Sequence, residues 1–357
     1  MADNETATAS TSADPASNAP AASVAGTPAD PTTSASAAPK VLTVVVPCHN
    51  EQDTAQAFYD ATSAVAAGEL APMGVTVRYV FVDDGSRDRT LEVLRALDAA
   101  HPEVSYLSFS RNFGKEAALF AGLTAAAKRS DLVAVMDADL QDPPELLPQM
   151  VKRALSGEYD RVAARRTSRE GEPPIRSWFA RRFYSLMNRL TDLDLRDGAR
   201  DFSVMTRRFV DAVLSCGEYN RFTKGLFGWV GYPTTWVEYL NVERVAGETN
   251  WSFWSLVHYA LDGIVAYSVK PLEMLTAAGG VVSLCALLAL VFVVVRAAIF
   301  GDPVAGWPSL MTVIILVGGL LTVGLGVIGY YLSKIYLEVK GRPVYLLKES
   351  SDRDWLR

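Results

Sequence analysis

Two aspartates one residue apart, followed by a glutamine, are the side chains in this sequence best suited to chemistry. Asp137, Asp139 and Gln141 directly follow the apolar run 132–136, which is typical of a buried strand. Carboxylate and amide oxygens are ligands that Mg²⁺ and Mn²⁺ prefer. A cation there would let the site bind a diphosphate, which bare carboxylates repel. The alternative interpretation is a strand end with solvated acids.

The elements that must position these acids alternate along the chain. Short apolar runs typical of strands are separated by stretches long enough for helices, and Pro143 and Pro144 end the fourth run and open a helix. Such alternation predicts βαβ units, and therefore an α/β fold with a mostly parallel sheet. Ligands bind sheets of this kind at the carboxyl ends of the strands. The expected strands are 41–46, 77–82, 104–109, 132–136, 160–164 and 199–205, with two more at 229–232 and 236–242.

The N-terminal residues 1–39 differ in composition from the rest of the chain. They consist mostly of Ala, Ser, Thr, Pro and Asp, without the basic and apolar regions of a signal peptide. We expect a disordered tail, because this composition cannot bury enough apolar surface to fold. The formal net charge of the chain is −6, which gives no reason to expect a nucleic-acid partner. The three cysteines are widely spaced, so a reducing compartment is expected.

Two long uncharged stretches lie near the C-terminus, one within 271–300 and one within 308–333. Each reaches the length of about 20 residues that a helix needs to cross a bilayer, so we expect a transmembrane helix in each range. A buried helical hairpin in a soluble protein is the alternative. The aromatic-rich range 251–270 is expected to form a juxtamembrane amphipathic helix. The aromatic and basic range 175–190 is interpreted either as a membrane-surface helix or as an ordinary packed helix.

Basic residues near the two spans set the expected orientation. Lys270 precedes the first span, and Lys334, Lys340 and Arg342 follow the second, whereas the connection between the spans carries no Lys or Arg. Positive charge beside a span favours the cytoplasmic side. The protein is therefore expected in the cytoplasmic membrane with two spans. Its α/β domain, both termini and the C-terminal tail 334–357 would lie in the cytoplasm.

Several motifs in this order resemble those of family-two glycosyltransferases of the GT-A fold. The resemblance is narrower still to the polyprenyl-phosphate glycosyltransferases of that family, the group of bactoprenol glucosyltransferases and dolichyl-phosphate mannosyltransferases. It covers about residues 40–347, with the catalytic domain at 40–250. The residues that carry it are Pro47-Cys-His49-Asn-Glu51, Val82-Asp-Asp84-Gly-Ser86, Asn112-Phe-Gly-Lys115, Asp137-Ala138-Asp139-Leu-Gln141 and the two expected spans.

The resemblance implies inverting transfer of a hexose from a nucleotide sugar to a polyprenyl phosphate such as undecaprenyl phosphate. It favours UDP-glucose as the donor, with GDP-mannose next, and Mg²⁺ or Mn²⁺ as the cofactor. It also suggests a homo-oligomer, in particular a tetramer.

The resemblance also assigns residues to the donor. Pro47, His49, Glu51, Val82 and Asp84 would hold the base and ribose. Asp137, Asp139 and Gln141, with Ala138 between them, would form the metal and diphosphate site. Lys115 is a secondary candidate for the phosphates or the sugar, or else a solvated lysine at a helix start. Arg244 would clamp the diphosphate, and Asn250 stands where the family has a lysine.

On the acceptor side, the resemblance points to Arg166 and, less directly, to Arg176. The fork of a guanidinium matches a phosphate, although Arg165, Arg181 or Arg182 could take their place. Asp201 is expected beside the reacting atoms. A lipid phosphate is already ionised at neutral pH and needs no general base, so Asp201 is interpreted as a positioning group first and a base second.

Two other functions remain open from the sequence. One is a glycosyltransferase that extends a polysaccharide or glycolipid, although the chain lacks the Gln-x-x-Arg-Trp motif of processive synthases. The other is a non-catalytic, membrane-tethered protein that binds a nucleotide sugar or a lipid. The intact pair Asp137 and Asp139 argues against the second.

Overall fold

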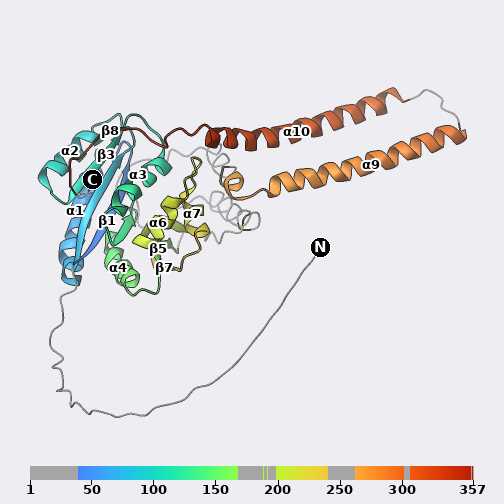
Figure 1. Ribbon diagram of the computed structural model, residues 1–357. Helices are drawn as coiled ribbons and strands as arrows, with labels where there is room; N and C mark the ends of the chain where they lie inside the picture. The colour runs from blue at the N-terminus through green and yellow to red at the C-terminus, as the bar shows by residue number, and fades with distance from the viewer. Residues whose placement is uncertain are drawn as a thin grey trace, which may run out of the picture. The chain divides into compact units, whose positions relative to one another are not determined.

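The computed structural model contains an α/β domain followed by two long apolar helices (Figure 1). It describes residues 39–167, 188, 191, 198–239, 262–300, 306–354 and 356. The expected N-terminal tail, the range 168–187 and the range 240–261 lie outside the described residues. Most of the surface helix expected at 175–190 therefore goes untested.

One sheet runs through the described part of the domain, in the order β7-β5-β6-β4-β1-β2-β3-β8. The pairs β1–β2, β1–β4, β2–β3 and β5–β7 are parallel, and β6 and β8 pair antiparallel with their neighbours. The predicted α/β fold with a mostly parallel sheet is confirmed. The strands are β1 Lys40–Cys48, β2 Val75–Asp83, β3 Val104–Phe109, β4 Leu132–Val135, β5 Arg161–Arg166, β6 Ala199–Thr206, β7 Thr234–Tyr239 and β8 Leu347–Ser350.

Helices pack on both faces of this sheet. Val44 and Val46 of β1 face α1, α2 and α4, while Val45 faces α3 and α6, because successive side chains of a strand point to opposite faces. Burial on both faces explains why the central strands are continuous apolar runs. The helices are α1 Ala55–Val65, α2 Thr90–Ala100, α3 Lys115–Ala127, α4 Leu147–Leu155, α6 Arg207–Ser215 and α7 Thr223–Trp229, with short turns η1 Ala66–Leu70, η2 Ala71–Met73 and η3 Pro144–Leu146.

The strand predicted at 229–232 is wrong, because these residues end a helix. Leu226 and Phe227 of α7 are buried, and Val230 packs against the same hydrophobic cluster as Phe227. A spacing of three and four residues is that of one helix face. Gly231 then leaves the helix with a φ of 73°. The aromatic and β-branched residues favoured a strand locally, and tertiary packing overrode that preference.

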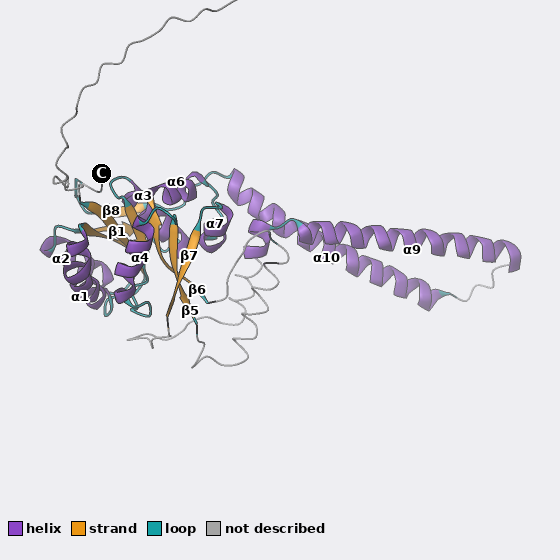
Figure 2. Cartoon of the chain, turned by 90° about the horizontal axis from the view of Figure 1, so that it is seen from below, coloured by secondary structure: helices purple, strands orange, loops and turns teal. Residues whose placement is uncertain are grey.

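The two apolar helices are α9 Lys270–Phe300 and α10 Trp307–Val339. Their most apolar windows have mean hydropathies of 2.8 and 2.3, and almost none of those residues is buried. The helices run side by side (Figure 2), and Leu275 of α9 lies against Gly324 of α10. A soluble helical hairpin would bury such surface, so its exposure disfavours that alternative.

The segment after α10, expected only as a C-terminal tail at 334–357, contains further secondary structure. The helix continues to Val339, six residues past the predicted end at 333, and the chain then returns to the domain, where β8 pairs with the edge strand β3 (Figure 1). Glu349 forms an ion pair with Arg95 at 2.7 Å, and Arg353 forms one with Asp98 at 3.0 Å. The C-terminal segment is thus an integral part of the sheet.

A cluster of polar contacts joins α10 to the end of the preceding segment. Residues 262–267 are helical, as expected for the end of the juxtamembrane helix. Asp262 accepts a hydrogen bond from the Tyr330 hydroxyl at 2.7 Å and pairs with Lys334 at 2.5 Å. These contacts anchor the C-terminal half of α10 to the chain that precedes α9.

Candidate active site

A lysine lies between two carboxylates at the carboxyl end of β4. Lys115 Nζ is 2.7 Å from Asp137 Oδ1 and 2.6 Å from Asp201 Oδ2, and Lys224 Nζ is 3.5 Å from Asp201 Oδ1. These side chains come from the start of α3, the loop after β4, strand β6 and helix α7. Three candidates that the sequence offered separately, Lys115, Asp137 and Asp201, therefore form one acid–lysine cluster together with Lys224.

The opposite charges in this cluster favour the ionised forms of Asp201 and Lys115. Burial alone would raise the pKa of Asp201, but the ammonium groups of Lys115 and Lys224 outweigh it and hold that pKa well below its usual range. Burial likewise lowers the pKa of Lys115, and the attraction of Asp137 and Asp201 more than reverses this. A carboxylate with so low a pKa is a weak proton acceptor, which favours a positioning role for Asp201 over a base.

A second ion pair fixes the loop that contains the three metal-ligand candidates. Arg200 donates to Asp142 Oδ1 at 3.0 Å and to Gln141 Oε1 at 2.9 Å. The hydroxyl of Tyr239 donates to Asp142 at 2.6 Å. Asp142 is almost completely buried, and this burial raises its pKa although Arg200 and Tyr239 oppose the rise. The loop after β4 is thus tied to β6 and β7 through Asp142.

The oxygen ligands in the loop after β4 fit a cation that is also coordinated by a bound substrate. Among the described residues, no group of three His, Cys, Asp or Glu side chains could hold a metal. Mg²⁺ commonly takes only one or two protein carboxylates, together with substrate phosphates and water. Asp137 and Asp139 can supply two such carboxylates. Gln141 Oε1 already accepts a hydrogen bond from Arg200, so its role as a ligand would require this oxygen to be shared.

The loops after β1 and β2, which are predicted to hold a nucleotide, are joined by hydrogen bonds between backbone and side-chain groups. Pro47 and Val82 are partners in the parallel register of the two strands. His49 Nδ1 lies 3.0 Å from the carbonyl oxygen of Asp84. The amide of Glu51 donates to Thr90 Oγ1 at 2.8 Å. These contacts hold the two loops together beside the loop after β3, with Val82 buried beneath them in the core.

Asp84 makes contacts other than the ligand contact that was predicted for it. Its carboxylate accepts hydrogen bonds from the backbone amides of Phe113 at 2.6 Å and Gly114 at 2.9 Å. Gly85 has a φ of 61°, and a Cβ atom there would lie 2.3 Å from the carbonyl carbon of Arg111, so only glycine fits. Asp84 and Gly85 therefore set the path of the loop that leads to Lys115.

The predicted acceptor residues are only partly covered by the structure. Arg166 ends β5, is half-buried, and donates its backbone amide to the carbonyl oxygen of Gly198 at 3.0 Å. Arg165 beside it pairs with Glu238 at 3.4 Å. The other predicted substrate residues, Arg176, Arg244 and Asn250, lie outside the described residues.

Three charged residues of the site were missed from the sequence. Arg200 directly precedes the predicted Asp201. Neighbouring side chains on a strand point to opposite faces, so the position of Arg200 could have suggested contacts different from those of Asp201. Lys224 lies in the first turn of α7, a helix that the sequence reasoning did not predict. Glu116 accepts hydrogen bonds from both the amide, at 2.8 Å, and the hydroxyl of Thr223, and so fixes the helix start that carries Lys224.

Comparison with known proteins finds relatives over most of the chain. Residues 43–214 match the sequence profile described as Glycosyl transferase family 2. The chain is 39% identical over 309 residues to the SfII prophage-derived bactoprenol glucosyl transferase of Shigella flexneri, covering 87% of this chain and 98% of that protein. It is 39% identical over 308 residues to the uncharacterized glycosyltransferase sll0501 of Synechocystis sp., covering 86% and 95%.

Among solved structures, the similarity is more distant. The glucosyl-3-phosphoglycerate synthase from Mycobacterium tuberculosis, in complex with Mn²⁺, UDP-glucose and phosphoglyceric acid, is 21% identical. The similarity covers 63% of this chain and 78% of that one, with a TM-score of 0.41. By contrast, the similarity to the Shigella protein extends over nearly all of that protein.

Proposed function

The chain belongs to glycosyltransferase family 2, and from this we propose that it transfers a hexose from a nucleotide sugar to a polyprenyl phosphate. We favour UDP-glucose as the donor, ahead of GDP-mannose, and undecaprenyl phosphate as the acceptor. The bactoprenol glucosyl transferase name of the Shigella relative supports a lipid acceptor. The observation that carries the proposal is the contact of Lys115 with both Asp137 and Asp201. This contact brings oppositely charged side chains together at the carboxyl end of β4.

In this proposal, the donor lies over the loops after β1, β2 and β3. Pro47, His49 and Glu51 contribute to the surface for the base and ribose, and Val82, whose side chain is fully buried, supports it from the core. Asp84 acts through the loop that it holds, since its carboxylate already accepts two backbone hydrogen bonds. The diphosphate then extends toward Lys115 and the two aspartates of the loop after β4. Arg244 and Asn250 would complete the diphosphate contacts.

Asp137 and Asp139 would hold Mg²⁺ or Mn²⁺, with Gln141 as a further oxygen donor. A bound divalent cation would offset the negative charge that develops on the departing diphosphate. Lys115 supplies positive charge at the same place from this chain, since its ammonium group lies against Asp137. Ala138, which is buried, keeps the two aspartates on one short, fixed stretch of backbone.

The proposed reaction is a single displacement at the anomeric carbon. An oxygen of the lipid phosphate forms the new bond, and the bond from that carbon to the diphosphate breaks, so the configuration inverts. The phosphate oxygen is already anionic, and no proton has to be removed. Arg166 and Arg176 would hold the acceptor phosphate, because a guanidinium can donate two parallel hydrogen bonds to it. Positioning and charge stabilisation then account for the rate.

Asp201 distinguishes this mechanism from one with a general base. Its low pKa supports the role of orienting Lys115 and Lys224. Asp201→Asn should lower kcat by about 10- to 100-fold, because the side chain keeps its shape and one hydrogen-bond acceptor. If turnover is abolished while donor and lipid still bind, the mechanism without a base is wrong.

We propose that α9 and α10 span the cytoplasmic membrane, with the catalytic domain and both chain ends in the cytoplasm. The length, apolar composition and exposure of the two helices support this. Lys270, Lys334 and Lys340 would lie at the cytoplasmic face. A homo-oligomer, and specifically a tetramer, stays a prediction from the resemblance.

A binding panel tests the choice of donor. Isothermal titration of the full-length protein in detergent with Mn²⁺ would compare UDP-glucose, UDP-galactose, GDP-mannose and UDP. We expect UDP-glucose to bind most tightly and GDP-mannose to bind more weakly. If none of these ligands binds with or without Mn²⁺, the proposed function is wrong. If GDP-mannose binds best, only the choice of donor is wrong.

A further inference from the structure

The segment that follows α10 contacts both elements that flank the loop leading to Lys115. This loop, residues 110–114, starts after Phe109 of β3 and ends before Lys115, the first residue of α3. The ring of Tyr345 stacks on Phe109, with 4.9 Å between ring centroids and 15° between planes. The same ring meets Phe120 of α3 edge to face at 6.4 Å. Tyr345 thus bridges the two elements that flank the loop.

Further contacts connect the same segment to the loop itself. The backbone amide of Ser110 donates to the carbonyl oxygen of Leu346 at 2.9 Å. Phe113 packs edge to face on Phe109 at 5.8 Å, and both belong to the hydrophobic cluster that Tyr345 joins. Phe113 and Gly114 are the residues whose amides bind Asp84. A continuous path of contacts therefore runs from Tyr345 to Asp84 and to the residue before Lys115.

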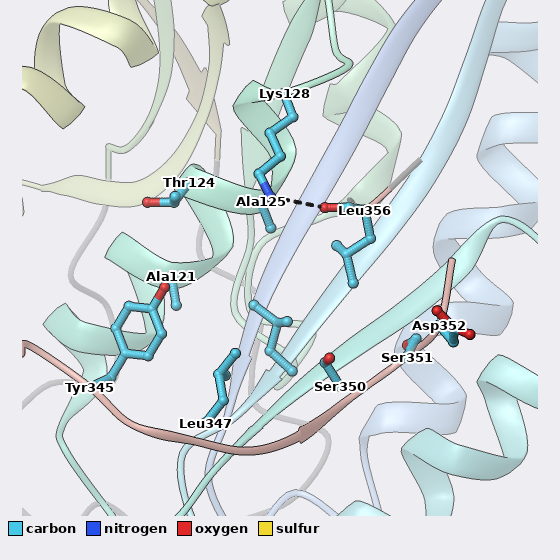
Figure 3. A pocket seen from close by; sticks show the side chains of 11 residues that line it. Ala121, Thr124, Ala125, Lys128, Tyr345, Leu347, Ser350, Ser351, Asp352 and Leu356 are labelled. Atoms are coloured by element: carbon cyan, nitrogen blue, oxygen red, sulfur yellow. Dashed lines mark hydrogen bonds between the residues drawn. The ribbon is translucent and has the colours of Figure 1, made fainter. Parts of the chain in front are cut away.

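Beyond Tyr345, the C-terminal segment packs less tightly on α3. A cavity of about 490 Å³ lies between them, lined by residues that include Ala121, Ala125, Leu347 and Leu356. Figure 3 shows Tyr345 at one end of this cavity, beside Ala121, and the hydrogen bond from Lys128 to Leu356 at the other end.

We propose that Tyr345 is a positioning residue for the donor site, acting through Phe109, Phe113 and the loop 110–114. The identity of the donor in this inference rests on the proposed function. The contacts of Tyr345 do not depend on it. Aromatic pairs of this geometry add stability beyond the apolar area that they bury. Loss of the ring frees both flanks of the loop, so the amides at Asp84 and the ammonium group of Lys115 lose their fixed places. The segment after the second apolar helix thereby supports donor binding from outside the catalytic loops.

The test compares Tyr345→Ala with Tyr345→Phe and Arg95→Ala in the full-length protein. Tyr345→Phe keeps the ring. Arg95→Ala removes a partly exposed ion pair of the same C-terminal segment, to Glu349, and such pairs contribute little to stability. Tyr345→Leu keeps an apolar side chain without the ring, and replaces Tyr345→Ala if that variant does not fold.

Hydrogen exchange and steady-state kinetics give the two readouts. In Tyr345→Ala we expect faster exchange at the amides of Phe113 and Gly114. We also expect the donor KM to rise by at least about tenfold, with the acceptor KM close to wild type and the thermal midpoint lowered, because the packing of the ring is lost. Tyr345→Phe and Arg95→Ala should match the wild type in all four measurements.

Two results would overturn the inference. One is unchanged exchange at Phe113 and Gly114 in Tyr345→Ala. The other is an equal loss of donor affinity and acceptor affinity, which indicates a merely structural role. If the wild type binds no nucleotide sugar, the proposed function is wrong, and the exchange rates, which need no ligand, still decide whether Tyr345 positions the loop.

Discussion

Lys115 is the residue on which the candidate site depends most. It begins α3, yet its ammonium group reaches Asp137 and Asp201, which lie on two other elements. The sequence could identify it as a candidate because it follows Asn112-Phe-Gly in a motif. Its contact with Asp201 spans 86 residues of chain, and no local pattern predicts so distant a pair. The side chain is 44% exposed, but its two ion pairs favour a role in the site over the alternative of a solvated helix-start lysine.

Removal of the Lys115 ammonium group should therefore impair catalysis strongly. We expect Lys115→Ala to lower kcat by about 10²- to 10³-fold, the usual effect of losing one preorganised electrostatic contact in an active site. Lys152→Ala is the matched control, because Lys152 is exposed on α4 and should retain wild-type activity. A steady-state assay of sugar transfer measures both. Equal activity of the two variants would contradict the role given to Lys115.

The low pKa of Asp201 predicts how this residue affects stability at different pH values. A depressed folded pKa contributes stability that is fully present above the unfolded value, about 3.9, and is lost as the pH falls toward the folded value. Wild type should thus exceed Asp201→Asn in thermal midpoint by a constant amount between about pH 5 and pH 8. The difference should shrink below about pH 4. A difference that grows on acidification would mean that the pKa is raised instead.

At the scale of elements, the sequence predicted the first half of the domain well. The strands β1 to β4 are continuous apolar runs because both faces are buried, and their lengths and the helices between them follow from local patterns. The position of β6 between β4 and β5 could not be predicted in the same way, since it depends on pairing between distant segments. Strand β8, with the sequence Leu-Lys-Glu-Ser, has no apolar alternation and is held mainly by its partner.

The site shows the same division between local and distant information. The metal-ligand candidates and the nucleotide loops directly follow strands and could be found from spacing. Arg200 and Lys224 could not be assigned, because the first contacts a loop 58 residues earlier in the chain and the second lies in a helix with two glycines and weak local preference.

The ion pair of Arg200 with buried Asp142 should be essential for the loop after β4. Arg200→Ala leaves a nearly inaccessible carboxylate without its charge partner, which typically costs about 3–5 kcal/mol. Arg207→Ala removes an exposed i,i+4 pair with Asp211, worth about 0.3–0.5 kcal/mol. Thermal or denaturant unfolding should separate the two variants clearly. Similar small losses would mean that Asp142 is not held by Arg200 in solution.

The tight approach of the loops after β2 and β3 should make Gly85 intolerant of a side chain. Both Gly85 and Gly157 have positive φ values, but only at Gly85 would a Cβ atom meet backbone, that of Arg111 at 2.3 Å. Gly157→Ala should cost about 1–2 kcal/mol, from its conformation alone. Gly85→Ala should cost more and should also weaken donor binding, measured by titration calorimetry. Equal effects on stability and an unchanged donor affinity would contradict this packing.

For the whole molecule, the catalytic domain and the two apolar helices are joined at more than one point. Asp262 ties α10 to the chain before α9, and β8 returns the C-terminal segment to the sheet. In the proposed orientation, this arrangement keeps the acid–lysine cluster on a domain fixed to the membrane, where a lipid phosphate can reach it. The sequence predicted the two helices from length and composition, but not the return of the chain to the sheet.

The most direct test of the account is the transfer of radiolabel from UDP-glucose to lipid in membranes that contain the protein. Parallel reactions would contain undecaprenyl phosphate or undecaprenol, with wild type or Asp139→Ala, and products would be separated by thin-layer chromatography. We predict label in a lipid that releases glucose under mild acid, only with the phosphorylated lipid and only with the wild type. No labelled lipid with any donor tested, or equal labelling of undecaprenol, would contradict a polyprenyl-phosphate glycosyltransferase.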